Sequence, residues 1–341
     1  METIKILQVP ASSVSIQQWK STLQSDIESN AALFLLNELP NNAFSSEAEL
    51  VLMGKNLSTD SLEPLRSLLL QHAVSQAVLS NLGVVENVHF MRISLNIPPQ
   101  ALSEAIKAFA AEQACDFALV ATLPDFSKPG LVLMDMDSTT IQIECIDEIA
   151  RLYGVGEQVS AVTAAAMRGE LDFNGSLRTR VSKLAHAPES LIKEVADTMP
   201  LMPGLVALIA GLKAANWKVA IASGGFTYFA NRLKEDHGFD AAYANTLEII
   251  DNTLTGEVVG EIVNADVKAR TLNELATQYQ IPASQTVAIG DGANDLVMMA
   301  ASALGIAIHA KPIVQEKASV ALNQLDLEGA LCLLTASLPL Q

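Results

Sequence analysis

The 341-residue sequence is poor in cysteine and has no long apolar run. Its three cysteines, Cys115, Cys145 and Cys332, lie far apart and lack CxxC spacing, which disfavours a disulfide framework, a zinc site and a thiol redox centre. No stretch approaches the roughly 18 apolar residues of a membrane span, and Met1 is not followed by the pattern of a signal peptide. We therefore expect a cytoplasmic protein with no membrane partner.

Positive charge is also scarce, because 21 Lys and Arg residues stand against 38 Asp and Glu residues, giving a formal net charge of -17. That sign disfavours a surface that neutralises nucleic-acid phosphates, so we expect no nucleic-acid partner. It does not exclude a small anionic ligand, because local charges decide that question. Half of the residues are hydrophobic, and the length is typical of about two folded domains.

The first part of the chain, residues 1–125, predicts an α+β region. The pattern from Met1 to about Leu82 is weak, and we expect helices there. Periodicity then predicts a strand over His89–Leu95, a helix over Leu102–Glu112 and a returning strand over Phe117–Thr122. The segment Pro124–Pro129 is typical of a linker.

The second part, residues 126–341, predicts an α/β domain. Continuous apolar runs at Leu131–Met134, Val219–Ala222 and Val287–Ile289 are typical of parallel strands buried on both faces. Helical patterns over Leu205–Ala215 and Thr271–Gln280 precede the second and third runs, which predicts a Rossmann-like parallel sheet.

The stretch from Asp147 to about Thr198 contains no comparable strand run and is rich in Ala, Glu, Leu and Lys. We interpret it as a helical insertion. It would form a cap, at about residues 147–200, over the edge of the sheet where ligands bind.

Two acidic motifs follow predicted strands. Asp135 and Asp137 come directly after the first strand, and a carboxylate pair at this spacing can hold a divalent cation, attack phosphorus or transfer a proton. Asp291, Asn294 and Asp295 come after the third strand, where carboxylates can complete the oxygen shell of Mg²⁺. Each motif alone is also compatible with an ordinary turn.

Two weaker features complete the set. Ser223 and Gly224 follow the second strand, where a hydroxyl and backbone N–H groups can bind phosphate oxygens. Lys268 adds a cation, although a lone lysine is usually a solvated side chain. All these features occur in one order, three of them at the ends of strands of one sheet, which argues against coincidence.

The order DxDxT, Ser, Lys, DGxND resembles the haloacid dehalogenase superfamily of aspartyl-phosphate hydrolases, over about Leu131 to Leu327. The segments Glu144–Ala150, Phe173–Val181 and Ser223–Phe226 resemble the phosphoserine phosphatases within it. The preceding strand-helix-strand part resembles a small regulatory module of the ACT type.

The resemblance implies a role for each motif residue. It makes Asp135 the nucleophile and Asp137 the acid and base. It implies one Mg²⁺, held by the Asp135 carboxylate, the Asp137 carbonyl and Asp291, with Asp295 supporting the metal from outside its direct ligands. The implied phosphate-binding groups are Ser223, the Gly224 amide and Lys268, of which Lys268 also stabilises the transition state. Asn294 would contact the phosphate or the water shell of the metal.

The same resemblance implies hydrolysis of O-phospho-L-serine, the last step of serine biosynthesis. Glu144 would bind the ammonium group of this substrate and Arg180 its carboxylate, while Met167 and Phe173 would form an apolar lid. The residues alone leave simpler interpretations open: a helix start for Glu144, a surface ion pair for Arg180, and ordinary cap packing for Met167 and Phe173.

Several alternatives stay open from the sequence. One is a phosphatase of the same fold acting on phosphothreonine, phosphoglycolate or a homoserine phosphate, and another is an inactive, serine-sensing regulator. The N-terminal region could bind an amino acid or form a homodimer. We assign no catalytic task to Cys145, interpreted as a buried cap thiol, or to the five histidines, His72, His89, His186, His237 and His309.

Overall fold

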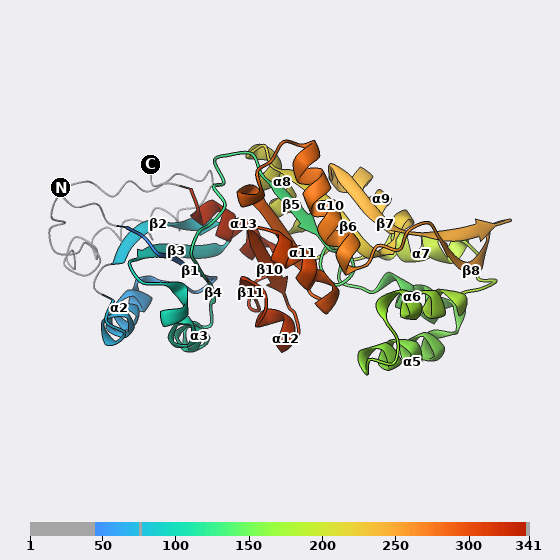
Figure 1. Ribbon diagram of the computed structural model, residues 1–341, viewed down its shortest axis with the longest axis horizontal. Coiled ribbons are helices and arrows are strands. Elements are labelled where there is room, and N and C mark those ends of the chain that lie inside the picture. Colours follow the sequence, from blue (N-terminus) through green and yellow to red (C-terminus); the bar gives the residue numbers. More distant parts are fainter. Residues whose placement is uncertain (1–44, 75–76, 339–341) are drawn as a thin grey trace.

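The computed structural model describes residues 45–74 and 77–338 and has an elongated shape (Figure 1). A small module lies at one end, an α/β core in the middle and a group of helices at the other end. Eleven strands form one sheet in the order β2-β3-β1-β4-β11-β10-β9-β5-β6-β7-β8. The strands are β1 Ala48–Gly54, β2 Ala77–Val85, β3 Val88–Leu95, β4 Asp116–Val120, β5 Leu131–Met134, β6 Lys218–Phe226, β7 Ala241–Ile250, β8 Thr253–Val259, β9 Thr286–Gly290, β10 Leu304–Ile308 and β11 Val320–Leu322. The helices are α2 Leu62–Gln71, α3 Ser103–Glu112, α4 Cys145–Tyr153, α5 Gly156–Met167, α6 Phe173–Ser182, α7 Ser190–Thr198, α8 Leu205–Ala214, α9 Thr227–His237, α10 Ala265–Gln278, α11 Leu296–Ala301, α12 Pro312–Gln315 and α13 Leu327–Ala336.

The central strand of the α/β core is β5, which lies parallel between β9 and β6. Its residues are all buried, because successive side chains belong to two different hydrophobic clusters. Val132 and Met134 belong to the cluster that includes α8, and Leu131 and Leu133 to the one that includes α10 and α11. The three predicted parallel strands are therefore confirmed, and β4 and β8 add antiparallel pairs that make the sheet mixed.

The expectation of helices before Leu82 is wrong for two described segments, which form β1 and β2. Strand β1 is buried on both faces although it contains a charged residue, Glu49. Arg92 of β3 donates to the Glu49 carboxylate at 2.8 Å, so the charge is paired inside the sheet. Residues 1–44 lie outside the described residues.

The N-terminal module has the element order β1-α2-β2-β3-α3-β4 and the antiparallel strand order β2-β3-β1-β4, a ferredoxin-like arrangement. Its strand β4 pairs with β11 of the core, with Ala118 opposite Val320. The segment predicted as a linker, Pro124–Pro129, therefore does not separate two sheets. Gln285 of the core binds the backbone of this segment, accepting from the Asp125 N–H at 2.7 Å and donating to the Asp125 carbonyl at 2.8 Å.

Helix α13 is buried along its whole length, between α8 and strands β1 to β3 of the module. Polar side chains of the module bind the backbone at its C-terminal end. Asn81 donates to the carbonyl of Ala336, and Arg92 donates to the carbonyl of Ser337 at 3.0 Å. The module and the core consequently share one helix as part of their hydrophobic interior.

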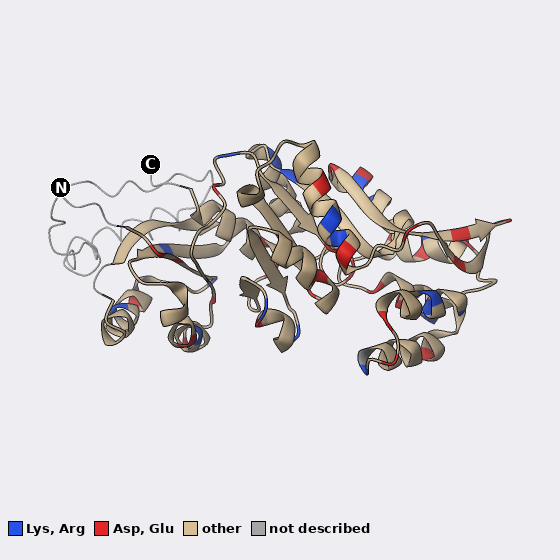
Figure 2. Cartoon of the chain, in the orientation of Figure 1, with Lys and Arg blue, Asp and Glu red and all other residues tan. Residues whose placement is uncertain are grey.

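Four helices, α4 to α7, fill the stretch predicted as a helical insertion, and the first of them begins at Cys145. Helix α6 lies against the hairpin strand β8. Basic and acidic residues are mixed along these helices and α10 (Figure 2). Among the described residues, no helix combines the length and the apolar character that crossing a membrane requires.

Candidate active site

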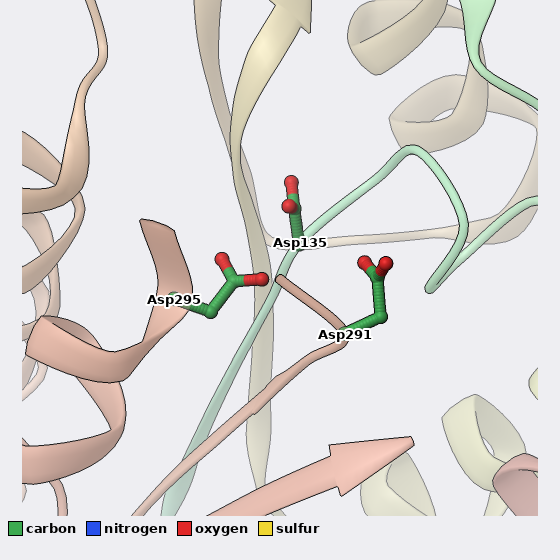
Figure 3. Close-up of side chains that lie close together, drawn as sticks. All are labelled: Asp135, Asp291 and Asp295. Atoms are coloured by element: carbon green, nitrogen blue, oxygen red, sulfur yellow. The ribbon is translucent and has the colours of Figure 1, made fainter. Parts of the chain in front are cut away.

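Three carboxylates meet at the carboxyl ends of the central strands. Asp135 follows β5, Asp291 follows β9, and Asp295 ends the short 3-10 helix η4 (Ala293–Asp295). One oxygen of each lies within 4.8 Å of one oxygen of the other two, and Figure 3 shows the side chains around a common space. In an open parallel sheet, ligands bind at this edge.

Lys268 ties two of these carboxylates together. Its Nζ lies 2.7 Å from Asp135 Oδ2 and 2.7 Å from Asp295 Oδ1, and its side chain is fully buried. Burial alone would lower the pKa of Lys268, but the neighbouring charges of Asp135 and Asp295 outweigh it and the pKa is raised. Lys268 is therefore a buried, fixed positive charge beside Asp135, not a solvated lysine.

The backbone after β5 fixes the orientation of Asp135. The N–H of Met136 donates to Asp135 Oδ1 at 2.7 Å, and the Thr140 hydroxyl donates to the Asp135 carbonyl at 2.5 Å. With Oδ1 held by a backbone N–H and Oδ2 by Lys268, the carboxylate is oriented before any ligand binds. Ser138 adopts a positive φ of 56°, so the chain turns back within the motif.

Asp137 lies beside Asp135 in a different environment. Its Oδ1 is buried without a hydrogen-bond partner in the described structure. Burial, and then the charges of Glu144 and Asp135, raise the pKa of Asp137 well above its ordinary value. A Cβ on Gly225 would lie 2.6 Å from Met136 Cε and 3.0 Å from Asp137 Oδ2, so glycine at this position leaves room for both side chains. Asp137 is thus suited to carry a proton at neutral pH.

Asp135, Asp291 and Asp295 fit a hard divalent cation, because oxygen ligands are the ones that Mg²⁺ prefers. Burial, and then the negative charge of Asp135, raise the pKa of Asp291 to about 6. Carboxylates held together against their repulsion are typical of a site that a cation neutralises. The Asp137 side chain is not part of this carboxylate group.

The end of β6 forms the opposite wall of the site. The N–H of Gly225 donates to Ser223 Oγ at 2.9 Å, and Ser223 is buried. A Cβ on Gly224 would lie 2.7 Å from Phe173 Cζ, so only glycine lets the Phe173 ring from α6 approach this strand. The structure thereby brings a cap residue onto the predicted phosphate loop.

These walls enclose a cavity of about 700 Å³ between the sheet edge and the helices α4 to α6. Arg180 reaches it from α6 with a buried Nε that has no hydrogen-bond partner in the described structure. Glu144 faces it from the start of α4 and accepts from the Ser138 hydroxyl at 2.8 Å. The predicted site residues that line the cavity are Asp135, Asp137, Glu144, Phe173, Arg180, Ser223, Gly224, Asp291 and Asn294.

Two predicted residues do not line the cavity directly. Lys268 and Asp295 are not among the residues that line it, and Lys268 contacts both Asp135 and Asp295. Met167 is the last residue of α5, and its side chain lies outside the described part of the structure.

The structure adds residues that the sequence reasoning did not assign. Thr139 donates to Asp291 Oδ1 at 3.1 Å, and Asp147 has a buried, unpartnered oxygen in the cavity wall. Both lie within segments that the motifs already marked. Lys311 lines the cavity and Asn245 contacts Gly224, and no spacing in the sequence distinguishes either residue.

Comparison with known proteins agrees with this geometry. The family model for haloacid dehalogenase-like hydrolases matches residues 129–303. A phosphoserine phosphatase of Vibrio cholerae is 58% identical over 226 residues, which cover 66% of this chain and 69% of that protein.

Solved structures extend the likeness to the N-terminal module. A probable phosphoserine phosphatase from Vibrio cholerae, in unliganded form, covers 89% of this chain and 93% of its own, with 45% identity and a TM-score of 0.74. A substrate-bound phosphoserine phosphatase complex covers 60% of this chain and 98% of its own, with 41% identity and a TM-score of 0.57. The chain therefore belongs to the haloacid dehalogenase-like hydrolases, within the family of the phosphoserine phosphatases.

Proposed function

We propose that this enzyme hydrolyses O-phospho-L-serine to L-serine and phosphate through a covalent aspartyl-phosphate, with one Mg²⁺ per site, as the last step of serine biosynthesis. The relatives are named for phosphoserine. One observation carries the proposal: Asp135 contacts a buried lysine, and Asp137, two residues later, has a buried oxygen without a partner in the described structure. This is the arrangement of a nucleophile beside a proton donor.

In the first step, Asp135 attacks phosphorus and the bond from phosphorus to the serine oxygen breaks. Asp137 gives its proton to that oxygen, which its raised pKa permits. Lys268, in contact with Asp135 Oδ2, balances negative charge as the phosphoryl group transfers. The Ser223 hydroxyl and the Gly224 N–H bind phosphoryl oxygens from the opposite wall.

In the second step, water attacks the phosphorus of the aspartyl-phosphate. The Asp137 carboxylate, now deprotonated, accepts the proton of this water, and the bond from phosphorus to Asp135 breaks. Asp135 and Asp137 return to their starting states and phosphate leaves. The same side chain thus serves as acid and then as base.

The side chains of Asp135 and Asp291 and the carbonyl of Asp137 would hold the metal. Asp295 would support the site from outside the direct ligands, by accepting from the N–H of Gly292, next to Asp291, at 2.9 Å. When bound, Mg²⁺ would neutralise charge between the phosphate and the attacking carboxylate. Asn294, which lines the cavity beside Asp291, would bind the phosphate.

Selectivity for phosphoserine would come from the α4 to α6 side of the cavity. Arg180 offers an unpartnered guanidinium N–H for a carboxylate, and Glu144 offers an acceptor for an ammonium group. Phosphoglycolate has no ammonium group and would not use Glu144. Phe173 would close the apolar side of the site. Met167, whose side chain lies outside the described part of the structure, stays a predicted member of this lid.

Phosphate release from a panel of small phosphoesters, with and without Mg²⁺, tests this function. Asp135→Asn keeps the size of the side chain but removes the nucleophile, so turnover should fall by at least about 10³-fold. A matched control is Asp197→Asn, which alters an exposed ion pair with Lys193 and Arg232 and should leave turnover within about twofold. Turnover that persists in Asp135→Asn would overturn the mechanism, and equal rates on phosphoglycolate would overturn the substrate.

We also propose that residues 1–125 form an ACT-like regulatory or dimerisation region beside a catalytic domain of residues 126–341. The ferredoxin-like order of the described strands supports this. Among the described strands, β2 ends the sheet on the module side, because β11 occupies the outer side of β4. Sedimentation of the full chain, with and without serine, tests both roles.

A further inference from the structure

Asn245 of β7 is a buried amide, 1% exposed, that has no part in the reaction described above. Its Nδ2 donates to the carbonyl of Gly224 at 2.8 Å. Its Oδ1 accepts from the N–H of Val263 at 2.8 Å. One side chain therefore joins the end of β6 to the segment that precedes α10.

The ladder between β6 and β7 explains why an amide is needed. Ala222 pairs with Tyr243 and Phe226 pairs with Asn245, but the register shifts between these pairs. Buried backbone groups that leave a ladder need other partners. The Asn245 amide supplies one for the Gly224 carbonyl, and the Ser223 hydroxyl supplies one for the Gly225 N–H.

The hydrogen bond from Asn245 and the hydrogen bond to Ser223 are both made by the peptide unit that joins Gly224 to Gly225. The carbonyl of Gly224 and the N–H of Gly225 point in opposite directions across a planar trans peptide. Asn245, by holding the carbonyl, fixes the direction of this N–H, which in turn donates to Ser223 Oγ at 2.9 Å. The Ser223 oxygen then accepts from the protein, and its hydrogen remains available for a phosphate oxygen in the cavity.

The second contact of Asn245 leads to the catalytic lysine. Val263 precedes Asn264, which begins α10 by accepting from the Val267 N–H at 3.1 Å. Lys268 lies in the first turn of α10, and its N–H donates to the Asn264 carbonyl at 2.9 Å. The start of this helix sets where the Lys268 side chain leaves the backbone.

We infer that Asn245 is a positioning residue for phosphate binding, which holds Ser223 and the start of the Lys268 helix in a fixed relation. This deepens the proposed phosphatase function and rests on it. Asn245 touches no reacting atom. Substituting it should therefore impair phosphate binding to the same extent in every substrate, whatever group the phosphate is attached to.

Two variants test the inference, with kcat and KM measured on phosphoserine and p-nitrophenyl phosphate and with inhibition by inorganic phosphate. Asn245→Ala removes both bonds, and Asn245→Asp keeps the size and an acceptor but loses the donor to Gly224. Each should lower kcat/KM about 10- to 100-fold on both substrates and weaken phosphate inhibition by a similar factor. In a Ser223→Ala background, the further loss from Asn245→Ala should be several-fold smaller, because the two residues act together.

Asn81→Ala provides the control, because Asn81 of the N-terminal module is an equally buried amide, and it binds the backbone carbonyls of Ala336 and Leu338 at the C-terminal end of α13, away from the cavity. It should lower the melting temperature and leave kcat/KM unchanged. Folded Asn245 variants with wild-type kinetics, or a loss confined to phosphoserine, would overturn the inference, as would failure of both variants to fold. Absence of activity in the wild type would instead refute the proposed function.

Discussion

At the scale of single residues, the two carboxylates that follow β5, Asp135 and Asp137, lie in different surroundings. Asp135 accepts a hydrogen bond from a backbone N–H and forms an ion pair with Lys268, whereas Asp137 is buried near other negative charges. The sequence marks both carboxylates and Lys268, but not the contact that brings this lysine, from a helix far along the chain, against Asp135. Geometry therefore gives each carboxylate a separate task.

Arg180 is the residue that should distinguish substrates. Arg180→Ala should lower kcat/KM for phosphoserine by about 10²-fold or more, because a site built for a carboxylate loses its partner, and affect p-nitrophenyl phosphate only a few-fold. Steady-state kinetics on both compounds measure this. Arg178→Ala, at an exposed position on the same helix, is the control and should change neither. Equal losses on both compounds would make Arg180 a structural residue.

Asp291 should make the stability of the protein depend on pH and Mg²⁺. Its pKa rises from 3.8 to about 6 on folding, so the metal-free folded state resists its ionisation. This destabilisation is full above about pH 6 and is lost as the pH falls towards 4. Without Mg²⁺, Asp291→Asn should therefore melt at a higher temperature than wild type at pH 8 and at the same temperature near pH 4.

Calorimetry with added Mg²⁺ completes that experiment. At pH 8 the metal should raise the melting temperature of the wild type and have little effect on Asp291→Asn, because a ligand is missing. Identical metal-free melting curves at pH 8 would contradict the assigned environment of Asp291.

At the scale of elements, the pairing of β4 with β11 is supported by one carboxylate. Asp116 accepts from the backbone N–H groups of Asn323, Gln324 and Leu325 at 2.9 to 3.2 Å, at the point where β11 ends. Its side chain is buried, so water cannot replace these bonds.

Removing this carboxylate should weaken the junction. Asp116→Ala leaves buried N–H groups without acceptors, and we expect the free energy of unfolding to fall by about 3 kcal/mol. Urea denaturation measures this, with Asp60→Ala, at an exposed position, as the control. A loss below about 1 kcal/mol would show that the junction does not depend on Asp116.

The elements also show which features a sequence can predict. The apolar run Leu131–Met134 matches β5 because a strand covered on both faces needs no polar alternation. The sequence does not indicate that β1 is buried on both faces, because β1 contains the charged residue Glu49. The burial of Glu49 depends on its ion pair with Arg92 of β3, which only the folded sheet brings together. The hairpin of β7 and β8 does have a signal in the sequence, the pair Asp251-Asn252, because both residues adopt the positive φ that a tight hairpin turn requires.

In the candidate site too, some residues can be predicted from the sequence and others only from the folded structure. Motif residues at strand ends converge because parallel strands end on one side of a sheet. Asn245 could not be found in this way, because its role depends on a register shift between β6 and β7 that arises only in the folded sheet. Likewise, the spacing of Lys268 does not reveal its contact with Asp295.

At the scale of the whole molecule, the module and the core should unfold together, because α13 belongs to the interior of both. Leu50→Ala opens a cavity on the side of β1 that faces α2 and α3, and should cost about 3 kcal/mol. Hydrogen exchange should show faster opening of amides in β5 as well as in β1. Destabilisation confined to the module would contradict a shared cooperative unit.

The shared helix also has a consequence for synthesis on the ribosome. Val51, Met53 and Phe90 of the module pack in the same cluster as α13, yet nearly all of the catalytic core is translated between them and that helix. The emerging module can cover its α2 and α3 face early, but its other face stays apolar and unprotected throughout that interval. A nascent chain stalled before Leu327 should therefore be a substrate for holding chaperones, and it should lose that dependence once α13 has emerged.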